Sequence, residues 1–276
     1  MSEMLKSVER GLFKDAQEAA YADESRWHHS TLLCPAARLG LVFYYARLLQ
    51  LFGVLPRDSH LRLSRPLDIL EPGCGAGMLS HPLSVMGNVW SFDYSSEAIR
   101  IAGALYGENR LVTFLEADGT TPEDIAGLQG KTFDVILMRE FHPLSRHVLG
   151  NPRPADLVAR YYSLVRTGGL IVIEHSLSPA AWRQREDVLD TSRLVRAFQG
   201  HLFVTDLLRT LLTLMRIRAF GAWLTGRPRL FEVVSNVLRP VVTLLCLMSR
   251  RQLSCTIVIQ KPACGDAAKD DPCQTG

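Results

Sequence analysis

Six short, nearly uninterrupted apolar runs restrict most strongly what this 276-residue chain can fold into. Five of them alternate with amphipathic segments through the middle of the chain, and the sixth follows much later. Apolar runs spaced by about 20 residues or more are typical of parallel strands covered by helices on both faces. The runs are Leu67–Leu70, Val89–Phe92, Leu111–Leu115, Phe133–Met138, Leu170–Ile173 and Leu253–Gln260. The sequence therefore predicts an α/β protein with a mostly parallel sheet.

The segments outside these runs predict helical additions to that core. Leu39–Phe52 reads as an apolar helix that ends near Gly53 and Pro56. Residues 178–252 are helical again and rich in leucine and arginine. The expected division is an N-terminal helical cap at 1–64, the core at 65–177, a helical substrate or cap region at 178–252, the final strand of the core at 253–261 and a disordered tail at 262–276.

The composition excludes several classes of protein. With 47% hydrophobic and 21% charged residues, the chain can bury a sizeable globular core. Its net charge of +3 is too small to indicate a nucleic-acid partner. The six cysteines form no C-x-x-C pair, so we expect reduced thiols, no metal and a cytoplasmic protein. The N-terminus mixes charges of both signs and lacks the apolar core of a signal peptide.

A glycine-rich loop follows the first apolar run directly, in the order Glu71-Pro72-Gly73-Cys74-Gly75-Ala76-Gly77. Glycines let the backbone turn sharply and approach a ligand, and the helix that follows would point its N-terminus at that ligand. Such a loop alone is weak support, since dinucleotide enzymes use one and a simple tight turn needs one too. Glu71 helps to distinguish the possible ligands, because a carboxylate at that position would repel a pyrophosphate but would suit a cationic ligand.

Two further acids end the next two runs. Asp93 comes 16 residues after Gly77, where it could accept both hydroxyls of a ribose, and Asp118 could accept from an adenine amino group. The carboxyl ends of parallel strands are where open α/β sheets bind ligands. Three acids in register are therefore hard to explain as solvated turn residues.

Together these segments resemble the motifs of the class I S-adenosylmethionine (SAM)-dependent methyltransferase superfamily. The resemblance covers roughly residues 65–176 and the late strand, and it is specific for the superfamily but not for a substrate. The matching segments are Glu71–Gly77 for the first motif, Phe92–Ser95 with Ala98 and Ala102 for the second, Ala117–Gly119 for the third, Phe133–Ile136 for the fourth strand and Leu164–Leu170 for the turn before the fifth.

The resemblance implies a Rossmann-like, mostly parallel seven-stranded sheet with N-terminal helices and a helical insertion before the last strand. It also implies SAM as cofactor, S-adenosylhomocysteine (SAH) as product, and no metal. The implied cofactor-binding residues are Glu71, Gly73, Cys74, Gly75 and Gly77 at the methionyl end, Asp93 at the ribose, Tyr94, Asp118 and Gly119 around the adenine, and Arg139 after the fourth strand. Pro82 departs from the pattern, since a proline a few residues into the first helix could bend it.

If the acceptor is a hydroxyl, a general base must take its proton. His142 follows the fourth run and His175 follows the fifth, so both could face the acceptor, and Glu140 could act as a base or orient a histidine. These three are our candidate catalytic residues. The alternative is that each histidine only ends a strand or bonds the backbone.

N-terminal helices often close over the cofactor in this superfamily. Tyr21, Trp27, His28 and His29 are candidates for such a role, and a surface loop is an equal alternative. After the fourth run the chain reads Arg139–Pro143 and lacks the Pro-Pro-aromatic run usual in enzymes that methylate nucleobase amines, so no nucleic-acid substrate is expected.

Residues 202–251 combine strongly apolar helices with many arginines. Three interpretations compete: a helical cap with an apolar substrate pocket or a homodimer face, a basic amphipathic element at a membrane surface, and a transmembrane helix. Arginines interrupt each run, which argues against a transmembrane helix.

The sequence favours a biosynthetic enzyme that methylates an O or N atom of a small, fairly apolar molecule. The first alternative is methylation of a lipid or lipid-linked glycan at a membrane face by a membrane-associated protein. An NAD(P)-dependent oxidoreductase is disfavoured, because the loop lacks the G-x-G-x-x-G spacing. An inactive SAM-binding protein is the remaining alternative.

Overall fold

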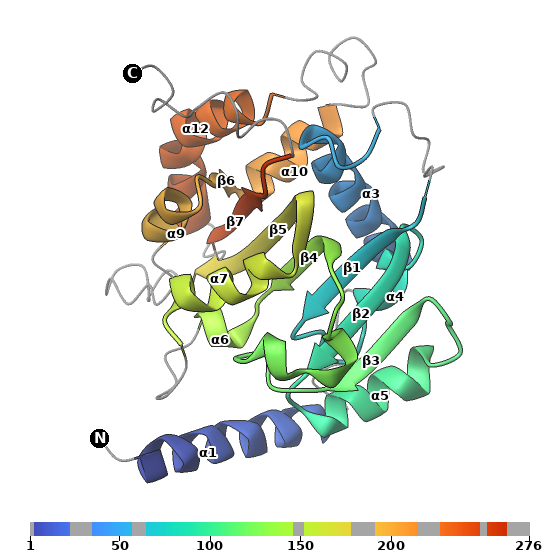
Figure 1. Cartoon of the computed structure of the whole chain (residues 1–276). Coiled ribbons are helices and arrows are strands. Elements are labelled where there is room, and N and C mark those ends of the chain that lie inside the picture. The colour runs from blue at the N-terminus through green and yellow to red at the C-terminus, as the bar shows by residue number, and fades with distance from the viewer. Residues whose placement is uncertain are drawn as a thin grey trace, which may run out of the picture.

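The computed structural model describes residues 3–22, 35–56, 65–145, 152–177, 191–214, 227–248 and 253–263. They build one seven-stranded sheet in the order β3-β2-β1-β4-β5-β7-β6 (Figure 1). Pairing is parallel from β3 to β5, and β7 runs antiparallel to both β5 and β6. The strands are β1 (Leu67–Pro72), β2 (Gly87–Asp93), β3 (Val112–Glu116), β4 (Phe133–Arg139), β5 (Val165–Leu177), β6 (His201–Val204) and β7 (Leu253–Gln260). The predicted seven-stranded α/β fold is confirmed.

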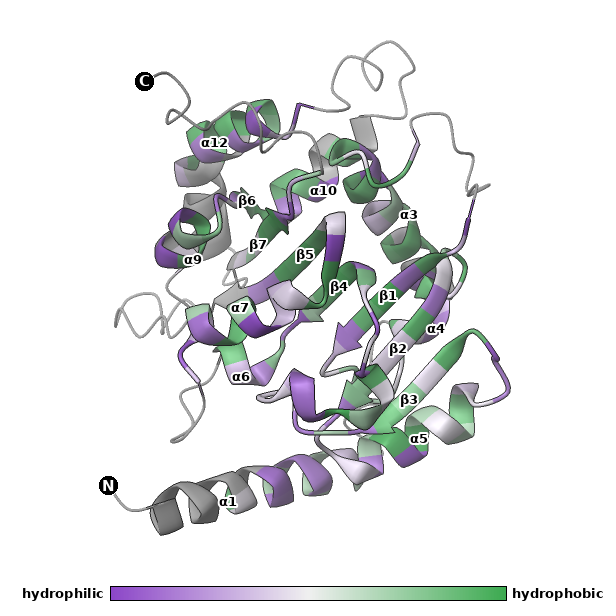
Figure 2. Ribbon diagram, viewed as in Figure 1, coloured by the Kyte–Doolittle hydropathy of each residue, from purple (hydrophilic) through white to green (hydrophobic). Residues whose placement is uncertain are grey.

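Helices cover both faces of this sheet. One face packs against α3 (Pro35–Leu51), α4 (Ser80–Leu83) and α10 (Thr205–Leu214), and the other against α6 (His142–Ser145), α7 (Pro154–Ser163) and α9 (Thr191–Ala197). Strand β4 is buried along nearly its whole length, and the central strands are coloured mainly hydrophobic, whereas α7 and α9 mix hydrophilic and hydrophobic residues (Figure 2). Strands that are buried on both faces have continuous apolar sequences. The positions of the central strands could therefore be predicted from the sequence.

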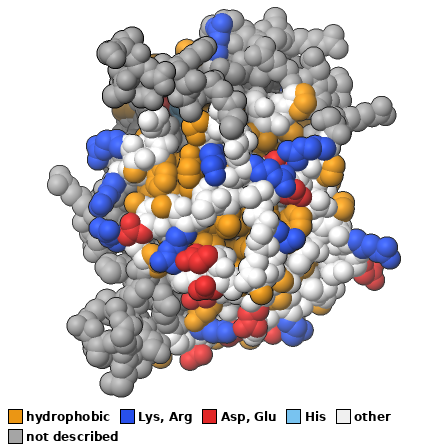
Figure 3. Space-filling view, in the orientation of Figure 1, with side chains coloured by type: hydrophobic (Ala, Val, Ile, Leu, Met, Phe, Trp, Pro, Cys, Tyr) orange, Lys and Arg blue, Asp and Glu red, His pale blue; other side chains and the backbone are white. Residues whose placement is uncertain are grey.

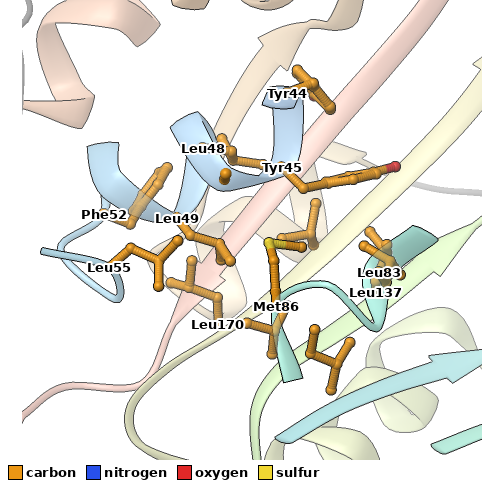
Figure 4. Packing of buried hydrophobic residues seen from close by; sticks show 14 of the residues in the cluster. Tyr44, Tyr45, Leu48, Leu49, Phe52, Leu55, Leu83, Met86, Leu137 and Leu170 are labelled. Atoms are coloured by element: carbon orange, nitrogen blue, oxygen red, sulfur yellow. The ribbon is translucent and has the colours of Figure 1, made fainter. Parts of the chain in front are cut away.

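The larger of the two main hydrophobic cores lies between α3 and the sheet. Leu48 and Leu49 of α3, and Phe52 just after its end, belong to one buried cluster with Leu137 of β4 and Leu170 of β5 (Figure 4). Burying side chains of this size contributes roughly 1.5–3 kcal/mol each. This packing holds α3 against β4 and β5. The other side chains of α3 that face the sheet are therefore also held in place relative to the ends of these strands.

Three further α-helices and two short 3-10 helices, η2 (Pro122–Asp124) and η3 (Ala126–Leu128), complete the described chain. α1 (Glu3–Ala22) packs against α5 (Ser96–Tyr106) beside β3, and α12 (Pro228–Met248) packs against β6. Among the described residues, no helix combines the length and the apolar character needed to cross a bilayer. On the face shown in Figure 3, acidic and basic side chains are interspersed around apolar patches.

The structure corrects two expectations. Residues 178–252 are not wholly helical, because His201–Val204 forms edge strand β6, a run too short to stand out among leucine-rich helices. The helix after the glycine loop is not a long helix bent at Pro82. It is the single turn α4, which ends at Leu83. The expected disordered tail lies outside the described residues from 264 onward, as do Trp27, His28 and His29.

Candidate active site

The glycine loop leaves β1 at the carboxyl edge of the sheet and needs its glycines for two reasons. Gly73, Gly75 and Gly77 have φ values of 73°, 53° and 72°, a left-handed conformation that other residues adopt at a cost. A β-carbon would also collide at each position. It would meet Phe141 at Gly73, the Tyr21 hydroxyl at Gly75 and Phe114 at Gly77. The loop is therefore a close-fitting backbone cradle.

Glu71 is a buried carboxylate immediately before this cradle. It accepts hydrogen bonds from the hydroxyls of Ser80 at 2.6 Å and Ser91 at 3.4 Å. Burial raises its pKa to about 7, although the two serines and the charge of Arg139 oppose that rise. A cationic group bound beside the loop would favour the ionised carboxylate, as expected for the site of a sulfonium or amino group.

Asp93 at the end of β2 ties the loop to the neighbouring strand. Its Oδ2 accepts from the backbone N–H of Gly75 at 2.8 Å and its Oδ1 from that of Ser95 at 3.0 Å. Burial raises the pKa of Asp93, while these N–H donors act against the rise. Asp93 thus lies between the glycine loop and the start of α5, where the sequence placed a ribose contact.

The adenine-side candidates lie after β3. Asp118 Oδ1 accepts from the backbone N–H of Thr120 at 2.9 Å, and the Gly119 carbonyl accepts from the Tyr161 hydroxyl at 2.8 Å. A β-carbon on Gly119 would meet Phe141, the same ring that faces Gly73. Phe141 therefore connects the third motif to the first, a contact that the sequence alone did not indicate.

Two other predicted residues of the cofactor site have clear surroundings. The Cys74 side chain is a buried free thiol whose pKa burial raises well above its usual range, so it packs as a small apolar group. Tyr94 lies under the ammonium of Lys14 on α1, with 5.1 Å between Nζ and the ring centroid. Their contact with a cofactor stays a prediction.

Helix α1 reaches the glycine loop through Tyr21 and is held there by Glu18. The Tyr21 ring packs with Ala76, and its hydroxyl lies over Gly75. Glu18 accepts from the backbone N–H groups of Ser96 at 2.8 Å and Glu97 at 2.9 Å. These are N–H groups of the first turn of α5 that lack partners within the helix. A side chain from another helix thus caps α5, which no local sequence pattern could indicate.

The three predicted catalytic residues separate into two groups. Glu140 has φ 49°, uncommon for a residue other than glycine, and its Oε2 lies 3.6 Å from Nδ1 of His175. His142 instead lies beside α1, where its Nδ1 is 3.3 Å from Nε2 of Gln17. The structure therefore brings Glu140 and His175 together and turns His142 toward α1.

A polar cluster missed by the sequence analysis lies beside them. The side chain of Glu174, 5% exposed, accepts at Oε2 from the Tyr45 hydroxyl at 2.9 Å. Arg139 Nε and one terminal nitrogen of Arg209 each lie 3.8 Å from that same oxygen. The cluster joins α3, β4, β5 and α10. The sequence signal for it was an acid directly after the fifth apolar run, but that acid lies within β5 and its partners on α3, β4 and α10 are distant in sequence.

The residues at this edge fit SAM. Glu71 and the N–H-lined glycine cradle could hold the cationic methionyl end, Asp93 the ribose, and the segment around Asp118 the adenine. In the described part of the chain, no three His, Cys, Asp or Glu side chains come together in a way that could hold a metal ion.

Comparisons with known proteins agree with this geometry. Residues 70–173 match the model of a family described as a methyltransferase domain. The chain is similar to a ubiquinone biosynthesis O-methyltransferase of Burkholderia multivorans, with 36% identity over 117 residues, or 41% of this chain and 46% of that protein. A protein of the same name from Mesorhizobium japonicum is 36% identical over 124 residues, or 44% and 45% of the two chains. The match thus spans about half the length of these relatives.

Solved structures show a similar overall fold. The plantazolicin methyltransferase BpumL, in complex with SAH, aligns with a TM-score of 0.51 at 15% identity over 94% of this chain and 99% of that chain. The plantazolicin methyltransferase BamL aligns with a TM-score of 0.53 at 13% identity over 94% and 98%. The family match, the strand order and the three acids at the carboxyl edge together place the core of this chain in the class I SAM-dependent methyltransferase superfamily.

Proposed function

We propose that this protein is an enzyme that transfers the methyl group of SAM to an oxygen or nitrogen of a small, fairly apolar molecule. The observation that carries the proposal is the pairing of the glycine cradle with buried Glu71 and with Asp93, whose carboxylate bonds the cradle at 2.8 Å. The names of the similar proteins, ubiquinone biosynthesis O-methyltransferases, support an oxygen acceptor.

SAM supplies an activated methyl group on a sulfonium, so the protein must chiefly hold the acceptor in line with it. Glu71 would stabilise the cationic methionyl end and Asp93 would fix the ribose. Phe141, packed against both Gly73 and Gly119, would form an apolar wall at the carboxyl edge. The cluster around Glu174 lies at the end of β4 and in the C-terminal part of β5, near the carboxyl edge where an acceptor would meet the methyl group.

The test is transfer of radiolabelled methyl from SAM to a panel of phenols, catechols and amines, after binding of SAM has been measured by calorimetry. Labelled product from a hydroxyl compound supports the proposal. A folded protein that binds no SAM would overturn it at the level of the cofactor.

A second candidate is methylation of a lipid-linked acceptor at a membrane surface. Val233, Val237, Leu238 and Val241 of α12 are exposed, at spacings that place several on one side of the helix. Such a row can enter the headgroup region of a bilayer. Co-sedimentation with anionic liposomes that is lost in Val237→Asp would favour this candidate. A concentration-dependent dimer sensitive to the same change would favour a homodimer face instead.

A further inference from the structure

Among the described residues, all partners of the Glu174 carboxylate lie at one of its two oxygens. Tyr45, Arg139 and Arg209 all approach Oε2, at 2.9, 3.8 and 3.8 Å. Oε1 is buried and has no hydrogen-bond partner among the described residues. A buried acceptor in this state is destabilising unless a further donor reaches it.

Arg139 shows the complementary gap on the adjoining strand. Arg139 on β4 is the register partner of Glu174 on β5. The NH1 atom of Arg139 is buried and has no hydrogen-bond partner in the described part of the chain. One group that both donates and accepts can satisfy these two atoms together. A hydroxyl is such a group, because its hydrogen can go to Oε1 of Glu174 while its oxygen accepts from NH1 of Arg139.

The position of the pair relative to the cofactor residues follows from the sheet. Side chains alternate between faces along a strand. Leu137 and Val172 belong to the core on the α3 face, so Arg139 and Glu174 also point to that face. Arg139 lies 3.8 Å from Glu174, and its charge also acts on the carboxyl of Glu71, so Arg139 is near both acids.

His175 follows Glu174 and therefore points to the opposite face, where Ile171 and Ile173 belong to the other core. We propose that Glu174, and not His142 or His175, receives the proton of an acceptor hydroxyl, and that Arg139 holds the same oxygen. This inference rests on the proposed methyl-transfer function and deepens it. The substrate class it names is a neutral phenol or alcohol.

The step balances without a further reactant. As the acceptor oxygen bonds to the methyl carbon, its O–H bond breaks and the proton moves to Oε1 of Glu174. The electron pair of the carbon–sulfur bond stays on sulfur, which becomes a neutral thioether. Arg139 stabilises the charge that develops on the oxygen, and Glu174 returns its proton to solvent after the ether leaves. Tyr45 is a positioning residue, since its hydroxyl fixes Oε2.

The test compares the wild type with Glu174→Gln, using 4-methylcatechol and its dimethyl ether as binding probes in the presence of SAH. In the wild type, calorimetry should show that the catechol binds at least about tenfold more tightly than the ether, because only the catechol can donate to Oε1. Glu174→Gln should reduce this preference. An unchanged preference would overturn the proposal, and would mean that a buried water satisfies Oε1.

Turnover provides the second readout. Glu174→Gln should lower kcat for 4-methylcatechol roughly a hundredfold or more while KM changes less. It should act far less on 4-nitrocatechol, which already ionises near neutral pH. An equal loss with both catechols would overturn the role in proton transfer. SAM binding by a wild type that methylates neither catechol would overturn the hydroxyl acceptor, whereas absent SAM binding would overturn the proposed function itself.

Asp134→Asn is the matched control. Like Glu174, Asp134 is a buried carboxylate with two arginines beside it, Arg65 and Arg166, but it lies near the start of β4, at the end of that strand opposite Arg139. Its loss should lower the stability of the fold without changing the catechol preference. A similar effect of both variants on that preference would mean that Glu174 acts only through folding.

Discussion

The buried carboxyl of Glu71 allows a quantitative test of the site before any acceptor is known. Its pKa rises from 4.5 to about 7, chiefly through burial. A raised carboxyl pKa means that the folded state binds a proton which the unfolded state has already released. The free energy of unfolding therefore falls as pH rises from 4.5 to about 7 and stays lower above that range. This rise in pKa corresponds to about 3 kcal/mol, since each pKa unit is worth about 1.4 kcal/mol.

Glu71→Gln removes this titration and keeps an oxygen that can accept from Ser80. The variant should be more stable than the wild type by about 3 kcal/mol near pH 8, and by less than about 1 kcal/mol near pH 5. Urea unfolding at both pH values measures the difference. A stability gap that is the same at both would refute the reasoning.

Asp134→Asn supplies a control of the opposite sign. Burial works against ionisation of Asp134, yet Arg65 and Arg166 lower its pKa overall. The stability that Asp134 contributes should therefore be full at neutral pH and disappear as pH falls through its folded-state pKa. If both variants changed stability with the same pH dependence, the opposite pKa shifts of Glu71 and Asp134 would be refuted.

Three further predictions concern the same edge of the sheet. Gly75→Ala should weaken SAM binding about tenfold, because a β-carbon strains the left-handed backbone and meets Tyr21. Gly53→Ala is the control and should leave SAM binding unchanged, because Gly53 is also left-handed but has open space around it. Glu18→Gln should weaken the cap of α5 by about 1 kcal/mol and lower SAM affinity about fivefold, as measured by calorimetry; unchanged affinity would exclude α1 from the site. SAM binding near pH 7 should release protons as Glu71 ionises, which calorimetry in buffers of different ionisation enthalpy detects; no buffer dependence would contradict it.

The sequence located features that depend on local pattern. The central strands are continuous apolar runs, and the glycines of the loop are required by φ values near +50° to +75°. Asp93 and Asp118 could be placed at strand ends because parallel strands end at one edge. Strand β6 could not, since four residues at a sheet edge carry no periodic signal of their own.

The contacts missed at the site depend on distance in sequence. Tyr45 lies 129 residues from Glu174, and Glu18 lies 78 residues from Ser96. Neither pair follows from propensity or spacing, because each depends on where a helix docks on the sheet. Glu174 was passed over in favour of His175 next to it, since the sequence does not show which of two adjacent strand residues faces the cofactor side.

The central claim is that the carboxyl edge of β1 and β2 binds SAM. Calorimetry with SAM at neutral pH, comparing the wild type with Asp93→Ala, tests it most directly, with unfolding curves to show that both proteins are folded. We predict micromolar binding to the wild type and a loss of at least about tenfold in the variant, because charged hydrogen bonds of Asp93 are worth about 1.5–3 kcal/mol. A folded wild type without SAM binding, or equal binding by both proteins, would contradict the account.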